Sequence, residues 1–266
     1  MRLLVCVKQV PDTTEIKIDP VTNTLIRAGV PSIVNPYDGY ALEVAARIKD
    51  KNPDTVITVV SMGPEQAKEA LKSCLAVGAD KAYLVSDRVF GGSDTLATSY
   101  ILSTVIKALE KKDGPFDIIF CGKQAIDGDT AQVGPEIAEH LNYPQVTYAV
   151  EVEPGKDTVK VKREVEDGYE ILEAKLPVLI TVTKTSFEPR YPSIKSKMAA
   201  SKAVIETITS KDLEIDASKI GLKGSPTKVK KTFTPQVSKA GIKIQGKAGA
   251  DAARELVTLL SEAKII

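Results

Sequence analysis

Short apolar runs alternate along this chain with segments of helical periodicity, and this rhythm constrains the fold more than any other feature. The apolar runs cover residues 2–7, 55–61, 81–85, 117–121 and 178–183. Between them, apolar side chains recur at helical spacing in segments 41–48, 67–75 and 97–109. The run Ile118-Ile119-Phe120 has no polar alternation, which is typical of a strand buried on both faces. The pattern predicts an α/β fold with a mainly parallel, Rossmann-like twisted sheet flanked by helices.

Two segments depart from this rhythm. Residues 15–27 are predicted to form a small hairpin around Asn23. Within residues 147–173, polar and apolar side chains alternate between the turn signals Pro154-Gly155 and Asp167-Gly168. We therefore expect an antiparallel β insertion there.

The chain changes character after Pro189. Residues 191–250 contain twelve lysines, no arginine and four acidic residues, a net charge of +8 in a chain of +1. Large apolar residues are few, so the segment is not expected to form its own core, and a closing helix is predicted over 251–263. With Tyr191 and Phe233 as its only aromatic residues, nucleic-acid binding is disfavoured. We expect an α/β domain over 1–190 and, over 191–266, an extended C-terminal arm laid along another protein.

Composition argues against several other kinds of site. The single histidine, His140, and the three cysteines (Cys6, Cys74 and Cys121) show no metal-ligand spacing, so no metal site is expected. The N-terminus turns polar too soon for a signal peptide, and no apolar run approaches the ~20 residues that span a bilayer. We expect no membrane span, and a cytoplasmic protein with reduced thiols.

Candidate binding loops follow the predicted strands. In an open parallel sheet, ligands bind at the carboxyl ends of the strands, where helix N-termini supply free N–H groups for phosphate. Such loops lie at residues 6–8, 35–38, 61–64 and 121–135. Asn35 suits a helix N-cap and Pro36 the first helical position, but neither the Walker A motif nor the dinucleotide glycine motif occurs. Caps and glycine turns occur in every α/β protein, so the residues alone leave a purely structural role open for each loop.

Several of these motifs together resemble one family. The strings Asn35-Pro36-Tyr37-Asp38, Ser61-Met62-Gly63-Pro64, Val77-Gly78-Ala79-Asp80 and Gly122-Lys123-Gln124-Ala125-Ile126-Asp127 appear in the order and spacing of the electron-transfer flavoprotein β subunit. The resemblance implies that the loops form one adenine-nucleotide site on the α/β domain. The implied cofactor contacts are Cys6, Asn35, Pro36, Tyr37, Asp38, Met62, Gly122, Lys123, Gln124, Ala125, Ile126, Asp127, Gly128, Asp129, Thr130, Ala131, Gln132 and Val133. In ordinary members this site holds AMP, while the redox FAD lies mainly on the larger α subunit, which is the implied heterodimer partner.

A further stretch, residues 90–99, resembles the electron-bifurcating branch of that family. There a second FAD replaces AMP, and the implied contacts of its flavin part are Gly91, Gly92, Ser93, Asp94, Thr95 and Thr98. The plainer alternative is a glycine loop followed by an aspartate cap. The resemblance implies that this FAD accepts hydride from NADH. One electron would go to ferredoxin or flavodoxin, and the other through the α-subunit FAD to a flavin dehydrogenase of the acyl-CoA or 2-hydroxyacid type.

Two other functions remain open at this point. One is a simple electron carrier with structural AMP in the same site, and the other is a nucleotide-sensing protein without a redox role. In either redox function the cofactor performs the chemistry, so no catalytic residue is expected and the chain would not act as an enzyme alone.

The last motif is the proline-stiffened segment 187–194. The family resemblance implies that it docks on the acceptor dehydrogenase through Glu188, Arg190, Tyr191 and Ile194, with Ile194 as an apolar anchor. The alternative is an ordinary connection into the basic tail.

Overall fold

The computed structural model describes residues 1–12, 31–230, 241–246 and 248–266. The hairpin predicted at 15–27 lies outside the described residues. Residues 1–12 and 31–230 belong to one compact unit, and the helix α7 (Gly249–Glu262) belongs to a second. Each unit is described by itself.

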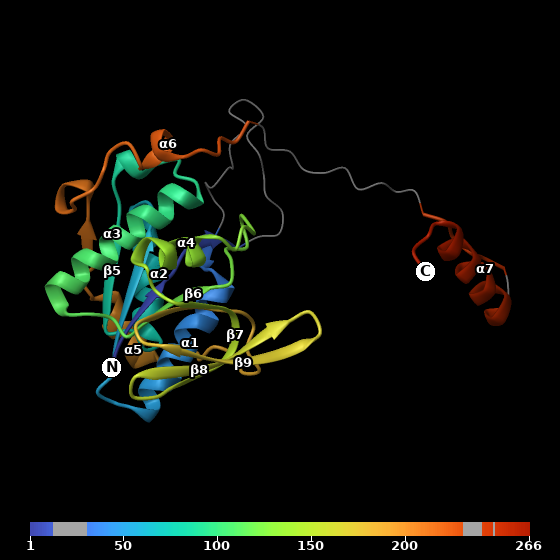
Figure 1. Ribbon diagram of the computed structural model, residues 1–266, viewed down its shortest axis with the longest axis horizontal. Coiled ribbons are helices and arrows are strands. Elements are labelled where there is room, and N and C mark those ends of the chain that lie inside the picture. The colour runs from blue at the N-terminus through green and yellow to red at the C-terminus, as the bar shows by residue number, and fades with distance from the viewer. Residues whose placement is uncertain (13–30, 231–240, 247) are drawn as a thin grey trace. The chain divides into compact units, whose positions relative to one another are not determined.

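The larger unit is built on a nine-stranded sheet with the order β11-β5-β4-β1-β6-β10-β7-β8-β9 (Figure 1). Its strands are β1 (Arg2–Cys6), β4 (Val56–Met62), β5 (Lys81–Val85), β6 (Ile118–Gly122), β7 (Gln145–Pro154), β8 (Thr158–Val165), β9 (Gly168–Lys175), β10 (Val178–Val182) and β11 (Glu206–Ile208). All neighbours from β11 to β7 pair in parallel, whereas β7, β8 and β9 pair antiparallel. The mainly parallel sheet and its antiparallel insertion are thus both confirmed. A separate two-stranded antiparallel sheet joins β2 (Gln9–Pro11) to β3 (Ser32–Val34).

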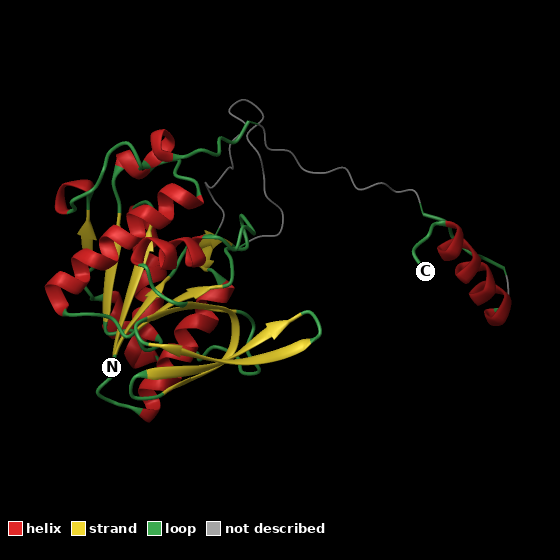
Figure 2. Ribbon diagram, viewed as in Figure 1, coloured by secondary structure: helices red, strands yellow, loops and turns green. Residues whose placement is uncertain are grey.

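Helices cover both faces of the sheet (Figure 2). The longer ones are α1 (Pro36–Lys51), α2 (Lys68–Ala76), α3 (Thr95–Asp113) and α4 (Val133–Leu141), and the short turns are η1 (Glu65–Ala67), η2 (Arg88–Phe90) and η3 (Ser210–Asp212). Strand β1 shows how the two cores divide. Leu3 and Val5 pack with side chains of α1 and α2, whereas Leu4 and Cys6 pack with those of α3 and α4. Because both faces of β1 are buried, its sequence is continuously apolar.

The chain beyond residue 190 returns to this sheet. Helix α5 (Ile194–Ser201) contacts α2, strand β11 pairs with β5, and the one-turn helix α6 (Gly221–Gly224) follows. Ile205, Ile208 and Ile220 are buried here, so the segment extends existing cores rather than forming one. Packing in the larger unit is continuous across residue 190, and the division predicted there for partner recognition stays a prediction.

Helix α7 carries the amphipathic pattern predicted for residues 251–263. It has Ala252, Leu256, Leu259 and Leu260 at helical spacing, and none of its residues is buried. Among the described residues, no helix combines the length and the apolar character needed to cross a bilayer.

Candidate nucleotide site

The carboxyl ends of three central strands bring the predicted loops together. Cys6 at the end of β1 is in register with Val60 of β4 and with Cys121 of β6. The loops that follow these strands therefore leave the same edge of the sheet. The fourth loop joins them because the backbone N–H of Lys8 donates to Asp38 in the first turn of α1, at 2.7 Å.

Asp38 links the loops at this edge of the sheet through hydrogen bonds. Its Oδ2 accepts the Lys8 N–H, and its Oδ1 accepts the N–H of Gly122 at 3.1 Å. Burial raises the pKa of Asp38 to about 7, although hydrogen bonds from Asn35, Lys8 and Gly122 act in the opposite direction. Both carboxylate oxygens accept hydrogen bonds from this chain. Asp38 therefore positions the backbone of Lys8 and Gly122 and is not itself available to a ligand.

Two glycines of the predicted binding loop over residues 121–135, called the phosphate loop below, differ in what surrounds them. A Cβ on Gly122 would lie 2.3 Å from Oδ1 of Asp38 and 2.7 Å from the backbone carbonyl carbon of Tyr37. Glycine is therefore required there by the start of α1. A Cβ on Gly128 would meet no atom within 4 Å. The open space beside the loop is at Gly128.

Asn35 holds the loop in place. It occupies the predicted N-cap position of α1, but its side chain makes no capping hydrogen bond. Instead, Nδ2 donates to the carbonyl of Gln124 at 2.8 Å, and Oδ1 accepts the N–H of Ile126 at 3.1 Å. Asn35 therefore occupies the predicted N-cap position, but its side chain binds the loop after β6, which offers it a donor and an acceptor at once.

The two aspartates of the loop are bound by donors of this chain. Lys8 Nζ contacts both oxygens of Asp127, at 2.7 and 2.9 Å, and Gln124 Nε2 donates to Asp129 at 2.6 Å. Lys123 Nζ lies 5.0 Å from the centre of the Tyr148 ring. With Asp127 in an ion pair, less negative charge opposes an anion at this loop.

The end of the loop presents free backbone donors. Asp129 and Ala131 adopt left-handed conformations, with φ of 50° and 53°. The N–H groups of Thr130, Ala131 and Gln132 donate no hydrogen bond to any described residue, and α4 begins directly afterwards at Val133. Alternation of left-handed and right-handed backbone conformations, followed by a helix N-terminus, forms a concavity lined with N–H groups, which suits a phosphate.

The segment 91–98 forms the start of α3, and much of it is engaged by residues 221–227. Asp94 caps α3 by accepting the N–H of Ala97 at 3.0 Å and also accepts the N–H of Thr227 at 2.9 Å. Ser93 Oγ donates to the carbonyl of Phe90 at 2.8 Å and accepts the N–H of Gly221 at 3.1 Å. Gly92, with φ of 76°, faces Leu222, whose side chain would lie 2.6 Å from an added Cβ. The aspartate cap is therefore present, whichever ligand the segment contacts.

Thr95 joins this segment to the phosphate loop. Its hydroxyl lies 3.2 Å from Oε1 of Glu136 and 3.4 Å from Oε1 of Gln132. The other oxygen of Glu136 is buried and has no partner among the described residues. Glu136 was not predicted from the sequence, although it follows Gln132, the N-cap residue of α4, by four residues. The two predicted segments are thus neighbours, and their role as cofactor contacts stays a prediction.

The remaining predicted residues lie at the edges of the site. Cys6 and Cys121 are buried neighbours, and the hydrogen bond between them, together with burial, raises the pKa of the Cys121 thiol. Met62 packs beside this core, partly exposed. In the predicted docking segment, Glu188 and Arg190 bind residues of α1, whereas Tyr191 and Ile194 are exposed.

Comparison with known proteins gives one consistent result. A family model described as "Electron transfer flavoprotein domain" matches residues 22–213. The electron transfer flavoprotein β subunit of Megasphaera elsdenii is 55% identical over 244 residues, which cover 91% of this chain and 90% of that protein. The corresponding subunit of Thermoanaerobacterium thermosaccharolyticum is 54% identical over 267 residues, the full length of both. Subunit CarD of the caffeyl-CoA reductase-Etf complex of Acetobacterium woodii is 48% identical, also over both full lengths. This chain therefore belongs to the electron transfer flavoprotein family, among its β subunits.

Proposed function

We propose that this β subunit binds FAD at the loop of residues 122–133 and takes part in electron bifurcation with NADH as the electron donor. When bound, FAD supplies the redox chemistry: it accepts a hydride and passes electrons to two acceptors. This chain's residues bind and orient the nucleotide, and none of them is proposed as a catalytic group.

The observation that carries the proposal is a set of N–H groups, at Thr130, Ala131 and Gln132, that donate to no described residue and lie next to the open space at Gly128. Backbone donors at the start of a helix bind phosphate without needing an arginine or a Walker motif. Asn35 and Lys8 hold the loop through Ile126 and Asp127, so the donors are positioned before the ligand arrives.

FAD is favoured over AMP by what lies beyond the phosphate donors. Thr95, at the start of α3, contacts Gln132 and Glu136, so the segment of residues 91–98 lies beside the end of the loop of residues 122–133. The buried oxygen of Glu136 that has no partner in the described part of the chain suits a ligand hydroxyl, which a ribityl chain supplies. The observation that favours AMP is that Ser93 and Asp94 already have partners in this chain. A simple electron carrier with structural AMP is therefore the second candidate, while family membership speaks against a sensor without a redox role.

The partners follow from the family and from one relative. A β subunit of this family works with an α subunit. Residues 191–266 are proposed to provide the loop that recognises the dehydrogenase and a C-terminal arm that packs on the α subunit. CarD is named as part of a complex with caffeyl-CoA reductase, which favours an acyl-CoA-type flavin dehydrogenase over a 2-hydroxyacid type as the acceptor here. Ferredoxin or flavodoxin is proposed as the other acceptor. The three unpaired cysteines are consistent with the cytoplasmic location that we also propose.

Cofactor counting tests the choice between FAD and AMP. The heterodimer is purified, denatured, and assayed for flavin by absorbance and for nucleotides by chromatography. We expect two FAD per heterodimer and no AMP. One FAD with one AMP would refute bifurcation and leave the simple carrier.

A pair of glycine variants tests the location of the site. Gly128→Val should preserve folding but weaken nucleotide binding about tenfold or more, because one displaced charge-assisted hydrogen bond is worth ~1.5–3 kcal/mol. Gly122→Ala should instead lower the stability of the fold by ~1–3 kcal/mol, because its Cβ meets the backbone of α1. Unchanged nucleotide affinity in Gly128→Val would place the phosphate elsewhere.

A further inference from the structure

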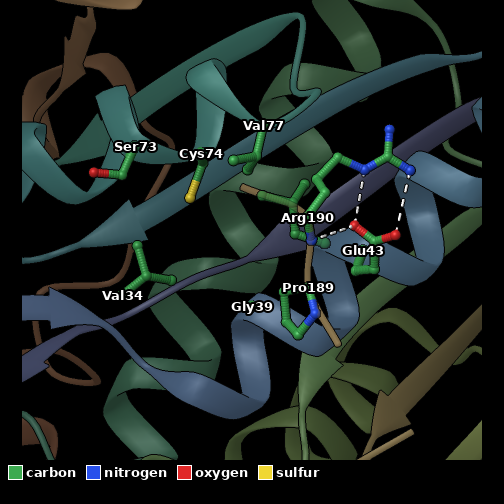
Figure 3. A pocket seen from close by; sticks show the side chains of 9 residues that line it. Val34, Gly39, Glu43, Ser73, Cys74, Val77, Pro189 and Arg190 are labelled. Carbon is green, nitrogen blue, oxygen red and sulfur yellow. Dashed lines mark hydrogen bonds and ion pairs between the residues drawn. The ribbon is translucent and has the colours of Figure 1, made fainter. Parts of the chain in front are cut away.

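The segment proposed to dock on the dehydrogenase is tied to helix α1 through Arg190. Its guanidinium binds Glu43, with Nε 2.8 Å from Oε2, and Asp50, with Nη2 2.7 Å from Oδ2. The backbone N–H of Arg190 also donates to Oε2 of Glu43 at 3.0 Å. Figure 3 shows the guanidinium and this N–H converging on Glu43. We call Glu43, Asp50 and Arg190 the carboxylate bracket.

Glu43 needs a cationic partner because it is buried, with a side chain only 4% exposed. Burial by itself would raise the pKa of Glu43, but hydrogen bonds from Arg190 and Arg47 hold that pKa below its ordinary value. A buried carboxylate that loses its cation is strongly destabilised. The forked guanidinium also fixes direction, because its parallel N–H groups fit one orientation of a carboxylate.

Neighbouring residues reinforce the same attachment. Glu188 accepts a hydrogen bond from the hydroxyl of Tyr40 at 2.8 Å, and the guanidinium of Arg47 lies 3.8 Å from the centre of the Phe187 ring. Residues 187–190 are therefore held along α1 by polar and cation–π contacts.

Apolar packing beneath the segment is incomplete. Pro189 and Arg190 line a cavity of about 170 Å³ together with apolar residues such as Leu42, Cys74 and Val77 (Figure 3). This cavity is open to solvent on one side, so the apolar atoms that line it have fewer dispersion contacts than atoms in a filled core. The position of the segment therefore depends on the carboxylate bracket as well as on the packing of α5 against α2.

The residues after the bracket point apolar groups at solvent. Tyr191 is 94% exposed, Ile194 82% and Met198 59%. Ile194 and Met198 are one turn apart on α5, so they share one face of that helix. Lys195, Lys197 and Lys202 are exposed around them. An apolar centre with a cationic rim fits a partner surface with an apolar pocket bordered by carboxylates.

We propose that Arg190 is a positioning residue: the carboxylate bracket holds residues 191–198 in one conformation, so that Ile194 and Met198 form a preformed two-point contact for the acceptor dehydrogenase. This rests on the proposed docking function of the segment. It also divides the four residues predicted for docking. Glu188 and Arg190 act on this chain, and Tyr191 and Ile194, joined by Met198, act on the partner. A segment ordered before binding loses less conformational entropy when it docks.

Hydrogen exchange tests the positioning without any partner dehydrogenase. Amides of residues 191–198 are followed by mass spectrometry in the intact heterodimer. We expect about tenfold faster exchange in Arg190→Gln and several-fold faster exchange in Asp50→Asn, since hydrogen bonds to charged groups are lost. Asp50 is exposed, so its variant should fold even if Arg190→Gln does not. Asp54→Asn, a matched charge change outside the bracket, should exchange like the parent. Unchanged exchange in both bracket variants would overturn the proposal.

Steady-state kinetics separate positioning from docking. A purified flavin-dependent acyl-CoA dehydrogenase is titrated as electron acceptor from the reduced heterodimer. In Arg190→Gln and Met198→Ala, the KM for the dehydrogenase should rise several-fold while the saturating rate and the flavin content stay unchanged. Arg190→Lys, which keeps the charge but not the fork, should restore only part of the affinity. If Ile194→Ala leaves the KM unaltered, the docking function fails. If Ile194→Ala raises the KM and the bracket variants do not, the docking function stands and the positioning role of Arg190 fails.

Discussion

Replacing Asp38 by asparagine should remove a specific pH dependence of stability. Asp38 is buried, and its pKa in the folded chain is raised to about 7 from an ordinary value of 3.8. Between these two values the folded state keeps a proton that the unfolded state has released. The contribution of Asp38 to stability is therefore fully present below pH 3.8 and is lost as the pH rises through 7.

The expected magnitude follows from the size of the shift. Each pKa unit corresponds to about 1.4 kcal/mol, so the rise costs ~4 kcal/mol over its whole range and ~2–3 kcal/mol between about pH 5 and pH 7. Asparagine has no titration, but it offers one acceptor oxygen to the two backbone donors, Lys8 and Gly122. This mismatch should cost ~1–3 kcal/mol at every pH. The pH-dependent and the pH-independent parts of the change in unfolding free energy can thus be separated.

Urea unfolding at a series of pH values measures both. The free energy of unfolding of the parent minus that of Asp38→Asn should fall by ~2–3 kcal/mol from about pH 5 to pH 7 and level off at higher pH. The same difference for Asp54→Asn, an exposed carboxylate, should vary little over this window. A parent-minus-variant difference for Asp38 that is constant or increases with pH would show that the carboxylate is not destabilised by burial.

Two further predictions concern α1 and α4. Gly39→Ala should stabilise the fold by ~0.5–1 kcal/mol, because Gly39 lies inside α1 and an added Cβ would meet Pro189 at an ordinary 3.9 Å; a lower melting temperature in calorimetry would contradict this. Glu136→Ala should weaken binding of the second FAD several-fold, whereas Glu136→Gln, which keeps an acceptor for Thr95, should weaken it less. FAD titration of the flavin-depleted heterodimer checks this, and equal affinities in parent and Ala variant would separate Glu136 from the cofactor.

The strands of the central sheet could be predicted because their own side chains carry the signal. Strand β5 begins and ends at the residues predicted, Lys81 and Val85, and the other predicted parallel strands differ by a residue at one or both ends. Strand β11 was not predicted. It is three residues long, Glu206–Ile208, and only Ile208 is buried. Its stability comes from pairing with β5 at the sheet edge, which a local hydrophobic pattern does not reveal.

The loops that come together in the candidate site could be predicted from the sequence, but the partners of their individual side chains could not. The family resemblance implied Gly122 only as a cofactor contact, and the structure adds that the nearest atom to a Cβ built there belongs to Asp38. Asn35 suggested a helix cap, whereas it binds the loop of residues 124–126. In each case the partner is more than eighty residues away in the chain. Local propensity identifies which residue type fits a turn, but only the folded chain decides which distant group it meets.

Helix α1 connects the two proposed functional regions, the nucleotide loop and the docking segment. Asn35 and Asp38 organise the nucleotide loop at its N-terminus, while Glu43 and Asp50 hold the docking segment further along. At 1.5 Å per residue, Asp38 and Asp50 are separated by about 18 Å along the helix axis. Ile48 and Ala45 of the same helix are buried against the sheet, so α1 is fixed along its length. A lost hydrogen bond at Asp50 should therefore loosen the docking segment without moving Asp38. Docking and cofactor binding can then be impaired one at a time, which is why flavin content is the right control for every docking variant.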